Sequence, residues 1–458
     1  MGHEADKESR RKLHVAPDTS TGLAQGAFRA HDPWAAVEFV RGAGARLWDA
    51  DGNEWIDLTC SFSVTNWGHG NVAFCQALHE QATALFHLTG QQDRWRNAAA
   101  RKLCQWVGRD IPDCRVLFHS SGARAIETAI RAATCWRPGK VLAIAPGFHG
   151  TSWGTCRLSG LDEILAAAAG GKLAGAGVPR DQVVVVGNSL VAAAGRCWWK
   201  AVQGELEALL AHDAAHISAL LVDPAFSTRG FLTPPASFGR WLRQRTTELG
   251  ILMIADEVQS GLGRCGDWLL SRRQGWNPDL VVVGKSLGGG IYPIAATLGP
   301  AAALDALPGA LVSETFAGNA LGCRLACAVL ELLANPSKKI FARATDLGRH
   351  LRRTLRCAVP GELMWRGRRL LTQVEGVGAV AALEFVPQGG QVEGDNAAEQ
   401  EAAADFAYRC FQERLRVHWS GPKRTRCVLL SPLTMDDEEL DDAMERLHEA
   451  ARQFLHHR

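Results

Sequence analysis

The part of the sequence that decides the fold runs from residue 251 to residue 299 and reads ILMIADEVQSGLGRCGDWLLSRRQGWNPDLVVVGKSLGGGIYPIAATLG. It contains two apolar runs, 251–254 and 280–283; Asp256 follows the first and Lys285 follows the second. Apolar runs of this length, bounded by polar residues and glycines, are typical of buried strands in a parallel sheet. Open α/β sheets bind ligands at the carboxyl ends of their strands, so Asp256 and Lys285 are predicted to lie near a ligand.

Each of the two charged residues also has an ordinary explanation. An aspartate after a strand usually caps a helix, and a single lysine is usually a solvated surface residue. The Gly284-Lys285-Ser286 tripeptide also resembles the end of a phosphate-binding loop, but that motif needs a glycine where Asp279 stands. Two opposite charges at buried strand ends are costly unless they pair with something. A ligand with a basic ring nitrogen and an aldehyde would use both, because the carboxylate keeps the nitrogen protonated and the amine forms a Schiff base.

The whole stretch resembles the class III (ω-amino acid) aminotransferases, which use pyridoxal 5'-phosphate (PLP) on the fold-type-I scaffold. The family pattern is an apolar strand, D-E-V-Q-T-G-x-G-R-x-G, then P-D, a second strand, G-K and a run of glycines. It appears here as Asp256-Glu257-Val258-Gln259-Ser260-Gly261, Gly263-Arg264, Gly266, Pro278-Asp279 and Gly284-Lys285.

The resemblance implies an α/β fold like that of aspartate aminotransferase, with a mostly parallel sheet in a large PLP-binding domain. A smaller α+β domain is expected to form from both ends of the chain. We predict an N-terminal segment of the small domain at 1–74, the large domain at 75–325 and the C-terminal small domain at 326–458. The alternation of apolar runs and helical patterns along the chain favours the same class.

The composition is that of an ordinary globular protein, with 458 residues, 47% of them hydrophobic and 21% charged, and a net charge of +2. A charge so near neutral argues against nucleic acid or a membrane surface as the main partner. No apolar run approaches the roughly 20 residues of a membrane span. The 13 cysteines form no C-x-x-C pair, so we expect reduced thiols in a cytoplasmic enzyme and no metal site.

A second segment predicts an anion site at the start of a helix. Ser121, Gly122 and Ala123 follow an apolar run and precede a helical pattern, and a helix N-terminus offers free N–H groups to an anion. An ordinary helix cap would have the same appearance. The segment resembles the family loop S-G-(A/T)-E-A, which holds the PLP phosphate, although Arg124 replaces the glutamate of that pattern.

Two further motifs resemble cofactor-binding segments of the family. Phe148 and His149 match the family's (Y/F)-H-G, in which the aromatic ring stacks on the cofactor. Thr315 begins a match to T-(F/Y)-G-G-N, in which the threonine reaches the phosphate in the neighbouring subunit, so the resemblance implies a homodimer with shared active sites. It also implies that Lys285 carries PLP as a Schiff base and moves a proton, that Asp256 holds the ring nitrogen, and that Gln259 binds the phenolic oxygen.

The sequence departs from the family at two positions that concern the substrate. Val428 stands where most glutamate-using members have an arginine for the α-carboxylate, and Thr228 stands where many have its glutamate partner. Arg229 and Arg426 lie nearby, and Arg426 would face the same way as Val428 on a strand. We therefore hypothesise that the enzyme does not handle glutamate and 2-oxoglutarate in the usual way. Either the amino donor is unusual, or a relocated arginine such as Arg229 or Arg426 holds the carboxylate.

The predicted function is a PLP-dependent aminotransferase that moves an amino group between a small amine or amino acid and a keto acid or aldehyde, in specialised metabolism. A PLP-dependent epimerase or racemase, an aminomutase or a decarboxylase of the same family would need the same lysine and aspartate. A binding protein without the cofactor is a third interpretation, which the intact Lys285, Asp256, Gln259 and Thr315 argue against.

Overall fold

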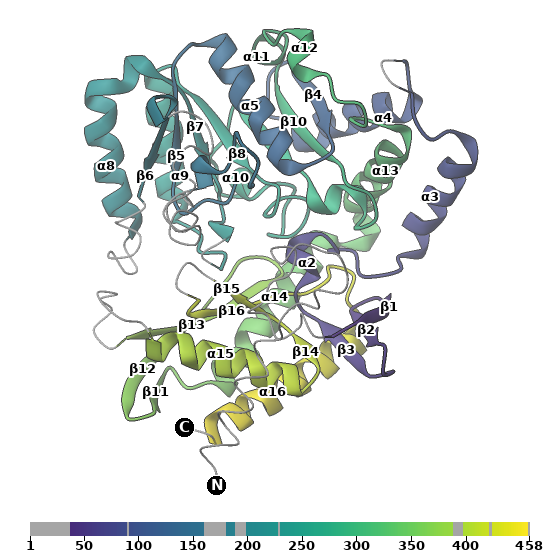
Figure 1. Ribbon diagram of the computed structural model, residues 1–458, viewed down its shortest axis with the longest axis vertical. Helices are drawn as coiled ribbons and strands as arrows, with labels where there is room; N and C mark the ends of the chain where they lie inside the picture. The colour runs from purple at the N-terminus through teal and green to yellow at the C-terminus, as the bar shows by residue number, and fades with distance from the viewer. Residues whose placement is uncertain are drawn as a thin grey trace, which may run out of the picture.

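The computed structural model describes residues 37–88, 91–159, 180–187, 198–227, 230–387, 397–420 and 424–456. Its strands form three sheets, and the largest lies in one half of the molecule, apart from the other two (Figure 1). Within the described part, no helix has the length and apolar character needed to cross a membrane.

The largest sheet has seven strands in the order β4-β10-β9-β8-β7-β5-β6. Neighbouring strands run parallel from β9 to β6, and β10 is antiparallel to both of its neighbours, so the sheet is mostly parallel. This confirms the predicted α/β class. The strands are β4 (Cys114–His119), β5 (Lys140–Ile144), β6 (Val183–Val186), β7 (Ile217–Val222), β8 (Leu252–Asp256), β9 (Leu280–Val283) and β10 (Ala295–Pro300).

Helices cover both faces of this sheet. On one face α5 (Gly122–Trp136) packs against residues such as Ala143, and on the other α8 (Trp198–Asp213) and α9 (Ala236–Glu248) pack against residues such as Leu142. Consecutive strand residues point to opposite faces, so strands covered on both sides must be apolar at every position. This explains why the two apolar runs in the 251–299 stretch do not alternate between apolar and polar residues.

Of the other two sheets, the four-stranded one joins segments from both ends of the chain, and the five-stranded one forms from C-terminal segments alone. The four-stranded sheet has the order β1-β2-β3-β14, and β14 pairs in parallel with β3. The five-stranded sheet has the order β11-β12-β13-β16-β15. The predicted domain boundaries at 74 and 325 stay predictions. The strands are β1 (Phe39–Ala43), β2 (Arg46–Asp49), β3 (Glu54–Asp57), β11 (Glu362–Trp365), β12 (Arg368–Glu375), β13 (Val380–Pro387), β14 (Leu415–Arg416), β15 (His418–Ser420) and β16 (Arg426–Leu430).

The remaining helices connect the sheets or cover them. Three long helices, α14, α15 and α16, lie with the two smaller sheets (Figure 1). The α-helices not yet named are α2 (Cys60–Ser63), α3 (Val72–Ala84), α4 (Arg94–Lys102), α10 (Leu270–Arg273), α11 (Ala301–Leu304), α12 (Gly309–Val312), α13 (Ala320–Ala334), α14 (Ile340–Ala358), α15 (Ala397–Gln412) and α16 (Asp437–His456). A π-helix, η4 (Leu103–Val107), and the 3₁₀ helices η5 (Arg157–Ser159), η6 (Arg180–Gln182), η8 (Ala214–His216), η10 (Lys285–Gly288) and η11 (Pro336–Lys338) complete the set.

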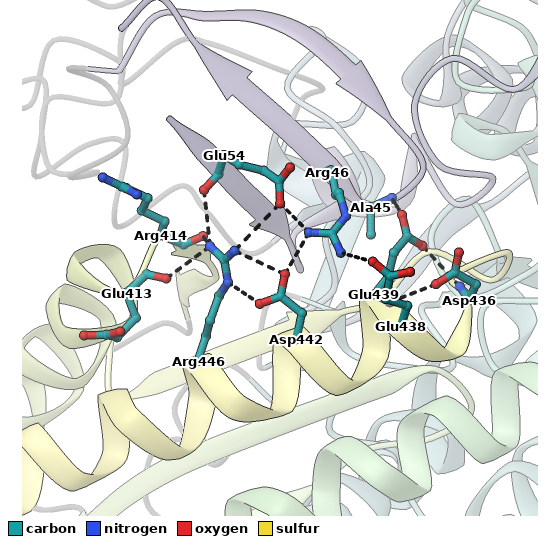
Figure 2. Close-up of polar contacts among 10 residues, drawn as sticks. All are labelled: Ala45, Arg46, Glu54, Glu413, Arg414, Asp436, Glu438, Glu439, Asp442 and Arg446. Carbon is teal, nitrogen blue, oxygen red and sulfur yellow. Dashed lines mark hydrogen bonds and ion pairs between the residues drawn. The ribbon is translucent and has the colours of Figure 1, made fainter. Parts of the chain in front are cut away.

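A polar network ties α16 to the N-terminal sheet (Figure 2). Asp442 accepts from Arg46 of β2 at 2.8 Å and from Arg446 at 2.6 Å, and Arg46 also pairs with Glu54 of β3. Arg446 donates to the Glu54 carbonyl at 3.2 Å. Hydrogen bonds between charged partners are stronger than neutral ones, so this network helps to join segments almost 400 residues apart in the chain.

Glu439 is expected to contribute more to stability than its neighbour Glu438. Glu439 is buried, accepts from the Ala45 N–H at 2.7 Å, and forms a capping box with Asp436, whereas Glu438 is exposed and 3.5 Å from Arg46. Glu439→Ala should lower the free energy of unfolding by about 2 kcal/mol, because the buried Ala45 N–H loses its acceptor. Glu438→Ala should change it by less than about 0.5 kcal/mol. Denaturant unfolding of both variants checks this, and equal losses would contradict it.

Candidate active site

Asp256 and Lys285 come from neighbouring strands of the large sheet. β8 and β9 are parallel, with Ile254 opposite Leu280 and Asp256 opposite Val282, so both strands end at the same edge. Asp256 is the last residue of β8 and is only 5% exposed. Lys285 begins the 3₁₀ helix η10 with a left-handed φ of 45°. A non-glycine residue in that region is strained, and such strain is concentrated at functional sites.

The environment of the Lys285 amine makes it more reactive than an ordinary lysine. Its Nζ donates a hydrogen bond to Gln259 Oε1 at 2.7 Å. Burial lowers the pKa of Lys285 to about 8, against the opposing effect of the Asp256 and Asp223 carboxylates. Near neutral pH a larger part of this amine is therefore unprotonated, which is the form that attacks an aldehyde.

A buried histidine holds the Asp256 carboxylate in place. His149 Nδ1 lies 2.8 Å from Asp256 Oδ2, and Asp256 Oδ1 accepts from the Val258 N–H at 3.1 Å. The backbone N–H of His149 donates to Ser159 Oγ at 2.9 Å, so the histidine is fixed in turn. Its Nε2 atom is buried and has no hydrogen-bond partner within the described residues. The sequence placed His149 among the cofactor-binding residues; the structure places it on Asp256.

Asp223 is a third buried charge at this edge, and it is not among the site residues predicted from the sequence. It follows β7, which pairs in parallel with β8. Its carboxylate accepts from the N–H groups of Ala225 and Ser227, both at 2.9 Å. Burial and the neighbouring Asp256 raise its pKa. The rule that singled out Asp256, a carboxylate directly after an apolar strand, would also have found Asp223.

The Ser121–Gly122–Ala123 turn lies close to the end of β8. Ser121 caps α5, and its side chain accepts from the Arg124 N–H at 3.3 Å. A Cβ atom at Gly122 would lie 3.0 Å from Val258 Cγ1, so only glycine fits without displacing Val258. The free N–H groups and the helix dipole at this end of α5 favour an anion such as a phosphate.

Phe148 and Thr315 are the two remaining predicted site residues. Phe148 is 39% exposed and comes after β5, the neighbour of β7 in the sheet, so part of its surface is open to a ligand. Thr315 is exposed in the loop between α12 and α13. Its neighbour Glu314 accepts from the Ser120 N–H at 2.8 Å, which brings this loop to the start of α5.

The described residues suit PLP. An amine of lowered pKa is available for the aldehyde, a fixed carboxylate for the ring nitrogen, and a capped helix start for the phosphate. The roles assigned to Ser121, Gly122, Ala123, Phe148, His149, Asp256, Gln259, Lys285 and Thr315 stay predictions.

Val428, at the position where most glutamate-using family members have an arginine, is apolar, and the nearby Arg426 is already paired with carboxylates. Val428 lies in a buried apolar cluster with Phe231. A Cβ at Gly230 would meet both Arg426 and Val428, so these two face the same side of β16, as predicted.

Two carboxylates surround the guanidinium of Arg426. It pairs with Glu384, which lies directly opposite it on β13, and with Glu375 at 3.4 Å. Burial works against its charge, but these carboxylates outweigh burial and raise its pKa. Thr228 and Arg229 lie outside the described residues.

Comparison with known proteins gives matches over most of the chain. The family model for Aminotransferase class-III matches residues 28–451. The ornithine aminotransferase of Bordetella pertussis is 30% identical over 363 residues, which cover 77% of this chain and 79% of that protein. Ornithine aminotransferase 1 of Staphylococcus aureus is 29% identical over 350 residues, 73% of this chain and 80% of that protein. Among solved structures, the ornithine aminotransferase from Toxoplasma gondii ME49 has a TM-score of 0.78 at 23% identity, covering 98% of this chain and 99% of that one.

Proposed function

The chain belongs to the class III aminotransferases, and from that premise we propose how its own residues serve the reaction. It is a PLP-dependent transaminase of fold type I. We infer that it moves an amino group between a small amine or amino acid and a keto acid or aldehyde. The observation that carries this proposal is the Lys285 amine, which donates to Gln259 and whose pKa of about 8 reflects its burial.

Lys285 is proposed to carry out the proton transfer. Bound PLP supplies an aldehyde that takes up the amino group and a protonated ring that accepts the electrons of the bond that breaks. With the cofactor bound, the Lys285 amine would hold it and, once freed by a substrate amine, would take a proton from the substrate carbon and return it to the carbon that carried the aldehyde. The lowered pKa suits both directions of this transfer.

The other residues are proposed to hold the cofactor. Asp256, fixed by His149 and the Val258 N–H, would keep the ring nitrogen protonated, because a buried carboxylate stabilises a proton on a basic neighbour. Gln259 would bind the phenolic oxygen, and Phe148 would stack on the ring. Ser121, Gly122 and Ala123 would hold the phosphate at the start of α5.

We also propose a cytoplasmic homodimer in which Thr315 completes the phosphate site of the second copy. The side chains of Phe86, Leu311 and Phe316 are exposed, and Phe316 lies next to Thr315 and packs on His87 with ring centroids 5.2 Å apart. Apolar exposure of this kind supports an interface between copies. The described cysteines other than Cys156 are free thiols, which supports a reducing compartment.

The reaction type is tested by a visible spectrum of the purified protein during addition of an amine without any keto acid. An aminotransferase consumes one equivalent of amine, loses the yellow band of the lysine-bound cofactor and stops. Continued consumption of the amine, with the yellow band retained, would instead indicate epimerase, aminomutase or decarboxylase chemistry. The relatives reported above are aminotransferases, so this alternative is not favoured.

Glutamate is expected to be a poor amino donor. Val428 offers no charge, and Arg426 is occupied by Glu375 and Glu384, so an incoming carboxylate finds no free cation among the described residues here. A lost charge-assisted hydrogen bond costs about 1.5–3 kcal/mol, so kcat/KM for glutamate should lie at least about tenfold below that of a similar amine without this carboxylate. Half-reaction kinetics with both donors measure this difference.

A variant at Glu375 tests whether glutamate is used poorly because Arg426 is occupied or because Val428 offers no charge. Glu375→Gln removes one carboxylate from Arg426 and should raise glutamate turnover severalfold, with little effect on an uncharged donor. Glu362→Gln is the matched control, because Glu362 pairs with the distant, exposed Arg369. Ordinary use of glutamate or 2-oxoglutarate by the wild-type enzyme would contradict the hypothesis.

A further inference from the structure

We propose that Arg124 is a positioning residue for the phosphate end of the cofactor, because it neutralises a carboxylate, Glu314, that is built into that end of the site. The inference rests on the proposed function, in which the Ser121–Gly122–Ala123 turn holds the phosphate. Arg124 occupies the position at which the family pattern has glutamate, so its charge is opposite to the expected one. The structure accounts for this reversal by the residues that surround its side chain.

Glu314 joins the end of β4 to the loop that carries Thr315. Its Oε1 atom accepts from the Ser120 N–H at 2.8 Å, and its Oε2 atom lies 3.3 Å from Nδ1 of the buried His119. Ser120 immediately precedes Ser121, which caps α5. A single carboxylate therefore fixes both the turn proposed to hold the phosphate and the loop whose threonine is proposed to serve the second copy.

This carboxylate stays ionised across the working range of an enzyme. Burial raises the pKa of Glu314, but the hydrogen bonds from His119 and Ser120 outweigh it and hold the pKa at about 2. A permanent negative charge one residue from a phosphate-binding turn repels the phosphate unless a cation balances it.

Arg124 is placed to balance that charge. Its Nε lies 3.9 Å from Glu314 Oε2, its NH1 group donates to Glu127 at 3.3 Å, and its NH2 group donates to the Leu311 carbonyl at 3.0 Å. These contacts hold the guanidinium between the first turn of α5 and the loop after α12. The guanidinium therefore braces the loop and, at 3.9 Å, offsets part of the charge of Glu314.

Arg131 offers a matched control, about two turns further along α5. It reaches two of the same partners, with Glu127 at 3.6 Å and the Leu311 carbonyl at 3.5 Å. No contact joins it to Glu314 within the described structure. A difference between the Arg124 and Arg131 variants therefore reports the pair with Glu314 rather than general loss of a surface arginine.

The experiment measures binding of PLP, and of pyridoxal, which lacks the phosphate, to the full-length protein after removal of its cofactor. Arg124→Met is expected to weaken PLP binding by about tenfold, the order expected for one unopposed charge within a Debye length of the phosphate. Pyridoxal binding should change less than twofold, and Arg131→Met should leave both unchanged. Adding Glu314→Gln to Arg124→Met should restore most of the PLP affinity, because the repelling charge is then gone.

The outcomes distinguish this inference from the proposed function. If Arg124→Met binds PLP like the wild type, or loses PLP and pyridoxal equally, or is not rescued by Glu314→Gln, the inference is wrong. If the wild-type protein itself fails to bind PLP through Lys285, the proposed function is wrong. If Arg124→Met does not fold, the variants Arg124→Lys and Glu314→Gln are measured instead. The inference is supported if Arg124→Lys keeps the wild-type PLP affinity and Glu314→Gln binds PLP as tightly as the wild type or more tightly. Weaker PLP binding by either variant overturns it.

Discussion

Replacement of Lys285 by alanine is expected to abolish transamination, with kcat falling by more than about 10²-fold. The lysine would serve twice, as the covalent anchor of the cofactor and as the base that moves the proton, and no other described amine lies beside Asp256. The methyl group of alanine can perform neither step. Steady-state turnover and the visible spectrum together measure both losses, since the variant should bind PLP without the yellow band of the lysine-bound form.

A matched lysine variant excludes general damage. Lys338 is exposed in η11, outside the candidate active site, so Lys338→Ala should keep wild-type activity and spectrum. Circular dichroism should show that both variants are folded. If Lys285→Ala retained more than about one per cent of the wild-type kcat, the assignment of the proton transfer to this amine would fall, because general acid–base catalysis alone accounts for about 10²–10⁴-fold.

Asp256→Asn is expected to lower kcat by about 10²–10⁴-fold while the protein still folds and binds PLP. The amide has the shape of the carboxylate and keeps an acceptor for the Val258 N–H, but it carries no charge to stabilise a proton on the ring nitrogen. Without that proton the ring accepts electrons poorly. Rapid-mixing measurement of the amine half-reaction isolates this step from the binding of the substrate.

Asp223→Asn is the control for Asp256→Asn. Asp223 is also a buried carboxylate at the end of a neighbouring strand, but its oxygens accept from Ala225 and Ser227 rather than from His149. For each variant, the fall in the logarithm of kcat is divided by the stability that the variant loses. We expect this ratio for Asp223→Asn to be less than a tenth of the ratio for Asp256→Asn. An equal fall in kcat for both variants would mean that the total negative charge at this edge matters, and not the place of Asp256.

Much of the fold follows from short patterns in the sequence. The runs at 251–254 and 280–283 are apolar at every position because helices or strands cover both faces of the sheet, and this signal is local. The edge that carries Asp256 and Lys285 follows from the same signal, since parallel strands end on one side. These features need only neighbouring residues and the general geometry of parallel sheets.

The partners of the charged residues could not be predicted in this way. Arg124 had no explanation in the sequence because its partner Glu314 lies 190 positions away, on a loop that reaches α5 only after the sheet has formed. Arg426 appeared free to bind a carboxylate, but the antiparallel pairing of β13 with β16 puts Glu384 opposite it. The contact between His149 and Asp256 depends on the turn after β5, which brings these two distant residues together.

The sequence by itself therefore determined the fold class, the family and the two residues on which the chemistry is proposed to depend, because these rest on local apolar patterns and on ordered motifs. The tertiary structure alone decided which charges are free and which are neutralised. Electrostatic interactions depend on distance and burial rather than on separation along the chain, so the neutralised Arg426, the fixed Asp256 and the Arg124–Glu314 pair became visible only when the strands and loops were in place.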